Sequence, residues 1–168
     1  MKTMVILPTY NEASNLPHMV AELFTLGLEG LEILVVDDNS PDGTGQIADD
    51  LRAKHPNAMH VIHRPGKLGL GTAYIAGFNY ALAHGADRIV QMDADFSHSP
   101  SHLPRFLELL ADYDVIIGSR YVSGGKLDEK WGLWRRFLSA FGNRYAAWVT
   151  GVPLKDLTSG FKCFRREA

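Results

Sequence analysis

The sequence predicts an α/β fold in which helices cover both faces of a mainly parallel sheet. Short β-branched runs alternate along the chain with stretches whose apolar residues repeat at helical spacing, and this alternation is typical of parallel sheets. The chain has 168 residues, of which 46% are hydrophobic, which is enough to bury a core without disulfides or metal. We therefore predict a single domain over residues 1–168.

Each expected strand is a short run rich in Val, Ile and Leu that ends at a polar, Gly or Pro residue. The first run stops at Pro8, which has no N–H for a sheet ladder. The expected strands are 3–7, 32–36, 59–62, 88–92 and 115–117.

Four helices are expected between these strands. The first begins near Asn15, and the second runs from Gly45 to Lys54 after several residues that favour helix caps. The third follows a glycine-rich turn. The fourth has Ser101 as its expected cap, because Pro104 then falls in the first turn, where its missing N–H costs nothing. The apolar positions that define the helices are 16, 20, 23 and 24; 47, 48 and 51; 74, 75, 78 and 82; 103, 106, 107 and 110.

Composition excludes several classes of protein. The net charge of −2 and the pI of about 6.4 provide no basic surface for nucleic acid. The single cysteine, Cys163, cannot form an internal disulfide, which favours the reducing cytosol. The sequence has neither a signal peptide nor an apolar run long enough to span a membrane. We expect a cytoplasmic protein whose contact with a bilayer, if any, is peripheral.

Polar residues gather in the loops that follow the expected strands. Open parallel sheets bind ligands beyond the carboxyl ends of their strands, so a site is expected there. Asp93 and Asp95 follow a strand directly, and residues two apart point to the same side. Their carboxylates suit Mg²⁺ or Mn²⁺ on a substrate diphosphate. Asp112 and Asp114 have the same spacing but precede a strand, so we interpret them as turn residues.

Other polar residues at this edge have two interpretations each. A carboxylate at Asp38 can accept hydrogen bonds from a base or from ribose hydroxyls, or it can cap the next helix. Asp42 is better explained as a structural cap, whereas Glu12 either faces the ligand or caps the first helix. These residue types are also ordinary turn formers.

The segment from Gly66 to Gly71 looks like a phosphate loop but matches neither the Walker nor the dinucleotide-binding pattern. It is interpreted as a turn into the amino end of a helix, with Arg64 and Lys67 available to a phosphate. His98 and His102 are four residues apart, but His98 is expected outside the helix, so a zinc site with Asp95 is not favoured.

An amphipathic helix rich in Trp and Arg is expected from Trp134 onward, with Arg135 among its basic residues. Such a helix can lie in a membrane interface with its arginines on phosphates. It can equally pack on the core of its own domain, and the sequence does not separate the two.

Five ordered motifs closely resemble the family 2 glycosyltransferases and, within them, the dolichyl (polyprenyl) phosphate mannosyltransferases. They are VILPTYNE at 5–12, VVDDNSPDGT at 35–44, QMDADFSH at 91–98, GSRY at 118–121 and DLTSGF at 156–161. The resemblance implies the Rossmann-like GT-A fold. It also implies transfer of mannose, with inversion, from GDP-mannose to a polyprenyl phosphate at the cytosolic face of a membrane.

The resemblance also assigns residues. It implies that the nucleotide is lined by Pro8, Tyr10, Glu12, Asp38 and Asp93. Asp95, with Asp93, would hold the metal on the diphosphate. Arg120 would meet the acceptor phosphate and the diphosphate, and Asp156 and Ser159 would border the sugar and acceptor pocket.

The expected chemistry fits these residue types. A cation and Arg120 can stabilise the negative charge that builds on the leaving diphosphate. An acceptor phosphate is largely a dianion at neutral pH, because its second pKa is near ~6, and needs little help from a base. A hydroxyl acceptor would need one, and Asp156 is the carboxylate available for that role.

Two alternatives stay open. The same fold can use another nucleotide sugar, such as UDP-glucose, or a polysaccharide acceptor, or it can bind a nucleotide sugar without catalysis. The chain stops at Ala168, where members of the family usually continue, so a C-terminal truncation is expected.

Overall fold

The computed structural model describes residues 1–119, 156 and 159–168. The chain divides into two compact units, one formed by Met1–Ile116 with Lys162–Ala168 and the other by Ile117–Phe161. The features that follow belong to the first unit unless stated otherwise.

The described residues form a six-stranded sheet with the order β3-β2-β1-β4-β6-β5. Its strands are β1 (Thr3–Thr9), β2 (Leu31–Asp37), β3 (Met59–His63), β4 (Arg88–Gln91), β5 (Val115–Ile117) and β6 (Lys162–Arg165). β1 pairs in parallel with β2 and β4, and β2 pairs in parallel with β3. The five strands expected from the sequence are therefore present in a mainly parallel sheet.

β6 was not predicted. It pairs antiparallel with β4, so that Cys163 lies opposite Val90. Its four residues alternate between buried and more exposed positions, a pattern too short to identify from the sequence. Burial raises the pKa of the Cys163 thiol to about 12, so this free cysteine is a small apolar residue of the sheet rather than a nucleophile.

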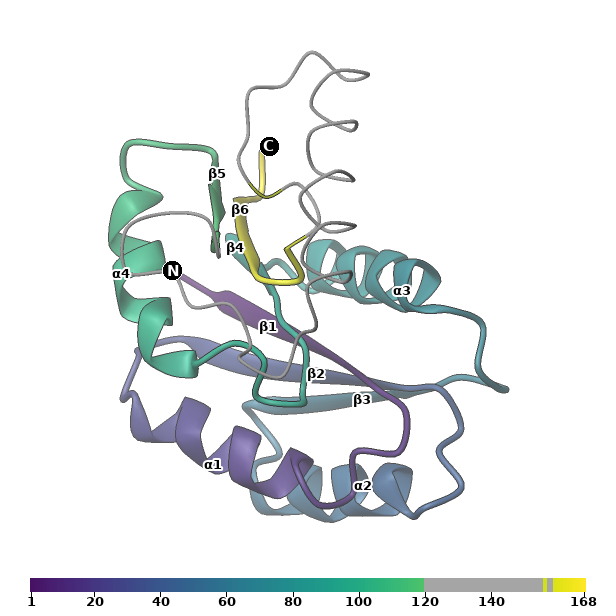
Figure 1. Ribbon diagram of the computed structural model, residues 1–168. Coiled ribbons are helices and arrows are strands. Elements are labelled where there is room, and N and C mark those ends of the chain that lie inside the picture. Colours follow the sequence, from purple (N-terminus) through teal and green to yellow (C-terminus); the bar gives the residue numbers. More distant parts are fainter. Residues whose placement is uncertain (120–155, 157–158) are drawn as a thin grey trace, which may run out of the picture. The chain divides into compact units, whose positions relative to one another are not determined.

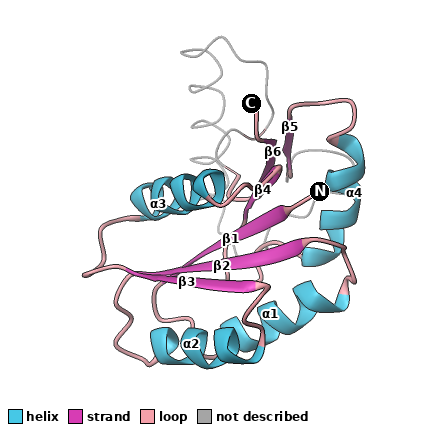
Figure 2. Cartoon of the chain, turned by 180° about the vertical axis from the view of Figure 1, so that it is seen from behind, coloured by secondary structure: helices cyan, strands magenta, loops and turns pink. Residues whose placement is uncertain are grey.

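The helices are α1 (Leu16–Thr25), α2 (Thr44–Lys54), α3 (Leu70–Ala83) and α4 (Leu103–Leu109). α1 and α2 lie on one face of β1–β3 and α3 lies on the other (Figures 1 and 2), as the sequence predicted. None of the described helices is both long enough and apolar enough to cross a membrane.

The start of α4 differs from the expectation. A short 3-10 helix, Pro100–His102, precedes it, and the side chain that accepts a hydrogen bond there is Ser99, from the Ser101 N–H. Pro104 still falls in the first turn of α4, where a backbone N–H has no acceptor within the helix, so its missing N–H costs nothing.

α3 packs closely on the sheet because of Gly77. A Cβ added at Gly77 would lie 2.5 Å from Cγ2 of Ile6, so any larger residue would push the helix away from β1. Met4 and Ile6 of β1 form a buried cluster with residues of β2 and α3, among them Ala73 and Tyr74. This packing holds the amino end of α3 beside the carboxyl edge of the sheet.

The register of the strands brings their ends together. Thr9 of β1 lies opposite Asp37 of β2, which in turn lies opposite His63 of β3. β4 ends three positions earlier relative to β1, because its last residue, Gln91, pairs with Ile6 and β1 continues to Thr9. The loop after β4 therefore leaves the sheet beside the last residues of β1.

Candidate functional site

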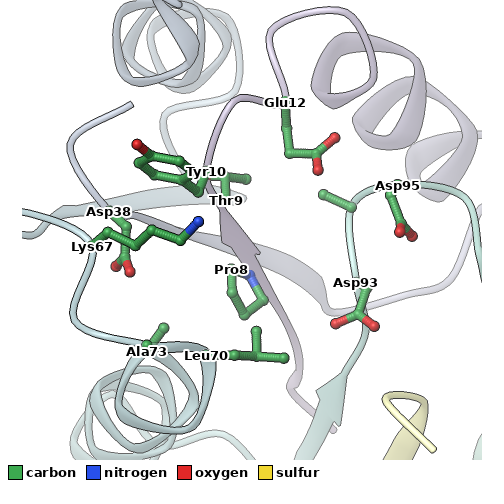
Figure 3. A pocket seen from close by; sticks show the side chains of 12 residues that line it. Pro8, Thr9, Tyr10, Glu12, Asp38, Lys67, Leu70, Ala73, Asp93 and Asp95 are labelled. Atoms are coloured by element: carbon green, nitrogen blue, oxygen red, sulfur yellow. The ribbon is translucent and has the colours of Figure 1, made fainter. Parts of the chain in front are cut away.

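A cavity of about 310 Å³ lies at the carboxyl edge of the sheet, where the ends of β1, β2 and β4 meet the loop into α3 (Figure 3). Its lining is Pro8, Thr9, Tyr10, Glu12, Asp38, Lys67, Gly69, Leu70, Ala73, Asp93, Ala94 and Asp95. The structure thus brings together seven residues that the sequence singled out for a nucleotide sugar or a metal, namely Pro8, Tyr10, Glu12, Asp38, Lys67, Asp93 and Asp95. What they bind stays a prediction.

The aspartate that ends β2 forms hydrogen bonds inside the fold. Asp37 is 2% exposed, and its carboxylate accepts hydrogen bonds from the Thr9 hydroxyl at 3.0 Å and from the Ser40 N–H and hydroxyl at 3.1 and 2.5 Å. These bonds tie the ends of β1 and β2 to each other. Asp37 therefore shapes the rim of the cavity and does not line it.

Asp38 forms a buried ion pair with Arg64. Nη1 of Arg64 lies 2.9 Å from Oδ1 of Asp38, and the two side chains are only 7% and 8% exposed. The Leu68 N–H donates to Oδ2 of Asp38 at 3.2 Å, whereas Oδ1 accepts no hydrogen bond in the described part of the chain. Asp38 is nevertheless one of the residues that line the cavity, and a carboxylate there can accept from an N–H or O–H donor of a ligand.

The expectation that Arg64 is available to a phosphate was wrong. Besides the ion pair, Nη2 of Arg64 donates to the Thr72 hydroxyl at 2.6 Å. Its backbone N–H donates to the Asp37 carbonyl at 2.8 Å, which places the guanidinium next to Asp38. Sequence reasoning missed this pairing because it depends on β3 lying beside β2, which only the sheet order reveals.

Asp42 has a structural role, as the sequence favoured, but it is not the helix cap, because Gly43 is the N-cap residue of α2. It accepts hydrogen bonds from the Thr44 hydroxyl and N–H and from the Ala13 N–H, and the bond from the Thr44 hydroxyl is the main cause that lowers its pKa. Thr44 also accepts from the Glu12 N–H at 2.9 Å. This network holds the loop after β1 against the start of α2.

Glu12 lines the cavity, but it is not the cap of α1, whose N-cap residue is Asn15. Its Oε2 accepts from the Asn15 side-chain amide at 2.8 Å, which steadies the turn before α1. Its carboxylate also lines the cavity opposite Asp93 (Figure 3).

Lys67 supplies positive charge to the lining. Its Nζ lies 4.1 Å from the centroid of the Tyr10 ring, within the range of a cation–π interaction. This contact joins the loop before α3 to the loop after β1 across the cavity. An ammonium held there can meet an anionic group without losing a carboxylate partner, because the described structure gives Lys67 none.

Asp93 and Asp95 keep most of their hydrogen-bonding capacity. Oδ1 of Asp93 accepts from the Tyr74 hydroxyl at 2.7 Å, and Nδ1 of His98 lies 3.9 Å from Oδ2. Oδ1 of Asp95 accepts from the Ser97 N–H at 2.9 Å. Phe96, between Asp95 and Ser97, has a φ of 61°, which is a strained value for a bulky side chain. This strain marks the tight turn that carries Asp95.

The two carboxylates fit a cation that is shared with a substrate. No group of three or more His, Cys, Asp or Glu residues in the described ranges could hold a metal, so a closed zinc site does not form among them. Mg²⁺ and Mn²⁺ are commonly held by one or two carboxylates together with substrate phosphates and water. Asp93 and Asp95 would supply the protein ligands of such an ion.

Tyr74 is a site residue that the sequence analysis missed. It was interpreted only as an apolar position of a helix, although a buried tyrosine needs a partner for its hydroxyl, and that need was the available signal. Burial, and secondarily the charge of Asp93, raises its pKa far above the ordinary value. The hydroxyl therefore stays protonated and donates to Asp93.

The remaining predicted site residues are Arg120, Arg135, Asp156 and Ser159. Arg120, Arg135 and the helix expected from Trp134 lie outside the described residues. Asp156 and Ser159 belong to the second unit and are 1% and 2% exposed. There the Ser159 hydroxyl accepts from the Phe161 N–H at 3.2 Å. Their roles in acceptor binding and catalysis stay predictions.

Comparison with known sequences gives a consistent result. Residues 4–168 match glycosyl transferase family 2. The chain is 48% identical over 168 residues to polyprenol monophosphomannose synthase of Mycolicibacterium smegmatis, covering 99% of this chain and 62% of that protein. It is 46% identical to undecaprenyl-phosphate mannosyltransferase of Micrococcus luteus, with 99% and 68% covered. For dolichol-phosphate mannosyltransferase of Pyrococcus furiosus the identity is 41%, with 99% and 47% covered. The chain thus spans from about half to two thirds of the length of these relatives.

Solved structures share the fold. The mannosyltransferase PcManGT from Pyrobaculum calidifontis, in complex with GDP-Man and Mn²⁺, matches with a TM-score of 0.64 at 22% identity, covering 99% of this chain and 45% of that chain. Glucosyl-3-phosphoglycerate synthase from Mycobacterium tuberculosis, with Mn²⁺, UDP and phosphoglyceric acid, matches with a TM-score of 0.61 at 23% identity, covering 99% and 56%. The fold expected from the sequence, a GT-A-like arrangement, is confirmed.

Proposed function

This chain belongs to glycosyl transferase family 2, and on that premise we propose that it transfers a mannosyl group from GDP-mannose to a polyprenyl phosphate. The observation that carries the proposal is the cavity itself. It combines a buried carboxylate acceptor at Asp38, a lysine at its rim and an open pair of aspartates. Three relatives at 41–48% identity are named as polyprenyl-phosphate mannosyltransferases, which supports the donor sugar and the lipid acceptor.

Each part of a nucleotide sugar has a counterpart in the cavity. The Asp38 carboxylate would accept from the base or the ribose, with Tyr10 and Pro8 forming the adjacent wall. Lys67 would offset part of the diphosphate charge. Asp93 and Asp95 would hold Mg²⁺ or Mn²⁺, which when bound would neutralise the charge that develops on the departing diphosphate.

In the transfer itself, an oxygen of the acceptor phosphate would attack the anomeric carbon. The bond from that carbon to the diphosphate oxygen would break on the opposite face, and its electron pair would leave with GDP, so that the configuration inverts. Arg120 would hold the acceptor phosphate near the donor. No general base is required because the attacking oxygen is already ionised at neutral pH. Asp156 would have a proton to remove only from a hydroxyl acceptor.

We also propose that the protein meets its lipid acceptor by peripheral contact at the cytosolic face of a membrane, through the helix expected from Trp134. Flotation with liposomes that contain anionic lipid tests this part. We expect Trp134→Glu to reduce the membrane-bound fraction, because it places a charge among the rings of the interfacial face. Undiminished flotation would favour a helix packed on its own domain.

Calorimetry with GDP-mannose and with UDP-glucose, each with and without Mn²⁺, tests the donor assignment. We expect GDP-mannose to bind at least about tenfold more tightly, a difference of about 1.4 kcal/mol, and to require Mn²⁺ for full affinity. The variant Asp112→Asn should bind GDP-mannose and Mn²⁺ as the original chain does, since Asp112 begins an acid pair with the same spacing as Asp93 and Asp95 but does not line the cavity. Tighter binding of UDP-glucose would reject the mannosyl assignment. Donor binding without turnover in the full-length protein would indicate a binding module.

A further inference from the structure

We propose that Tyr74 is a positioning residue for the cation site, because its hydroxyl holds Asp93 in the orientation that leaves the second carboxylate oxygen open. This inference rests on the proposed function, in which Asp93 and Asp95 share a cation with the donor diphosphate. Tyr74 itself would touch neither the cation nor the donor, since it is not among the residues that line the cavity.

The hydrogen bond joins two rigid parts of the fold. Tyr74 lies in the first turns of α3, 19 positions before Asp93 in the sequence, and its hydroxyl donates to Oδ1 of Asp93 at 2.7 Å. Asp93 itself lies in the loop after β4, and its side chain is 31% exposed, so packing encloses it only in part. The bond therefore anchors a loop carboxylate to a helix.

The Tyr74 ring cannot easily turn away from Asp93. It is 6% exposed and belongs to the buried cluster formed with Met4, Ile6 and Leu34. Gly77, one turn later on the same helix, lets α3 approach Ile6 closely. The depth of this packing sets how far the hydroxyl reaches toward the end of β4.

Asp95 is anchored in a different way. Its Oδ1 accepts from the N–H of Ser97, two residues along the same loop, which is a local turn interaction. In the described chain, the long-range hydrogen bond to this acid pair comes from Tyr74. A carboxylate has about four lone-pair sites, so the bond at Oδ1 holds Asp93 and leaves lone pairs of Oδ2, from which Nδ1 of His98 is 3.9 Å away, for a ligand.

The test is a titration of Mn²⁺ into the whole chain, followed by electron paramagnetic resonance, with and without GDP. Losing the hydrogen-bonding partner of a metal ligand typically costs about 10–100-fold in metal affinity, so we expect Tyr74→Phe to weaken Mn²⁺ binding by at least about tenfold. Thermal unfolding should change little, since the substitution removes one oxygen and keeps the ring. Tyr80→Phe, on the same helix and partly buried, is the matched control and should bind Mn²⁺ like the original chain.

The outcomes separate this inference from the proposed function. If Asp93→Asn and Asp95→Asn leave Mn²⁺ affinity unchanged, the proposed cation site is wrong. The proposed role of Tyr74 is then wrong as well, because it depends on that site. If those variants lose Mn²⁺ while Tyr74→Phe retains it, only the role of Tyr74 is wrong.

A crystal structure with Mn²⁺ and GDP provides a second test that does not depend on how the variant folds. We expect the Tyr74 hydroxyl on Oδ1 of Asp93 and the ion on the Oδ2 side. A Tyr74 hydroxyl that bonds elsewhere while Asp93 keeps the ion would overturn the inference.

Discussion

Two pairs of aspartates lie at the carboxyl edge of the sheet, Asp37 and Asp38 where β2 ends and Asp93 and Asp95 in the loop after β4, and the two pairs have different partners. Asp37 and Asp38 are buried; the first accepts three hydrogen bonds and the second is paired with Arg64. Asp93 and Asp95 are more exposed, and within residues 1–119, 156 and 159–168 each accepts one hydrogen bond. No Lys or Arg forms an ion pair with either of them in the described part of the chain.

The difference separates carboxylates that build the site from carboxylates that are open to a ligand. Charge buried without a partner is costly, so the β2 pair must be satisfied inside the fold before any ligand arrives. The β4 pair lies where water can solvate it and where a cation can later replace that water. Adjacent acidic residues in a sequence therefore do not by themselves mark a metal site; their internal partners decide.

The largest effect is expected from removing the partner of Asp38. Arg64→Met keeps most of the apolar stem but leaves the Asp38 carboxylate buried without a countercharge. Breaking a buried ion pair in this way costs about 3–5 kcal/mol, and we expect a loss of that size in the free energy of unfolding, measured with urea.

The double variant Asp38→Leu with Arg64→Met provides the control, because it removes both charges. It should recover much of the lost stability. If Arg64→Met unfolds at the same urea concentration as the original chain, the ion pair contributes little and the contrast between the two loops weakens.

A smaller loss is expected at Asp37. Asp37→Ala leaves the Ser40 N–H and the Thr9 hydroxyl without their acceptor, and hydrogen bonds to a charged group are worth about 1.5–3 kcal/mol each. Water can reach part of the vacated space, so we expect a net cost of about 2–3 kcal/mol in urea unfolding. A change below about 0.5 kcal/mol would show that the β2 loop does not depend on this carboxylate.

The smallest effect on stability is expected at Asp95, where the same kind of change should act on binding instead. Asp95→Asn keeps an oxygen for the Ser97 N–H and should alter the free energy of unfolding by no more than about 0.5 kcal/mol. Its affinity for Mn²⁺ in the presence of GDP should fall sharply, whereas Asp112→Asn should leave both quantities unchanged. A large loss of stability in Asp95→Asn would place the β4 pair in the same structural class as the β2 pair.

Local signals in the sequence were enough for much of the fold and of the cavity. The β-branched runs identified five strands, and the position of Asp93 directly after one of them predicted the edge at which it lies. Contacts between side chains of different elements could not be predicted from these local signals. The partnership of Arg64 with Asp38 requires β3 beside β2, and that of Tyr74 with Asp93 requires α3 against β1 and β4. β6 was missed because its strand character comes from pairing with β4.

The sequence by itself determined which residue types follow each strand, since hydrophobic periodicity and turn chemistry act over a few neighbouring residues. Only the tertiary structure decided which of those side chains are neutralised internally and which stay open, because burial and ion pairing depend on contacts between segments far apart in the chain. In the sequence alone, Asp38 and Asp93 are both aspartates that follow an expected strand. Arg64 and Tyr74, brought in from β3 and α3, make them chemically different.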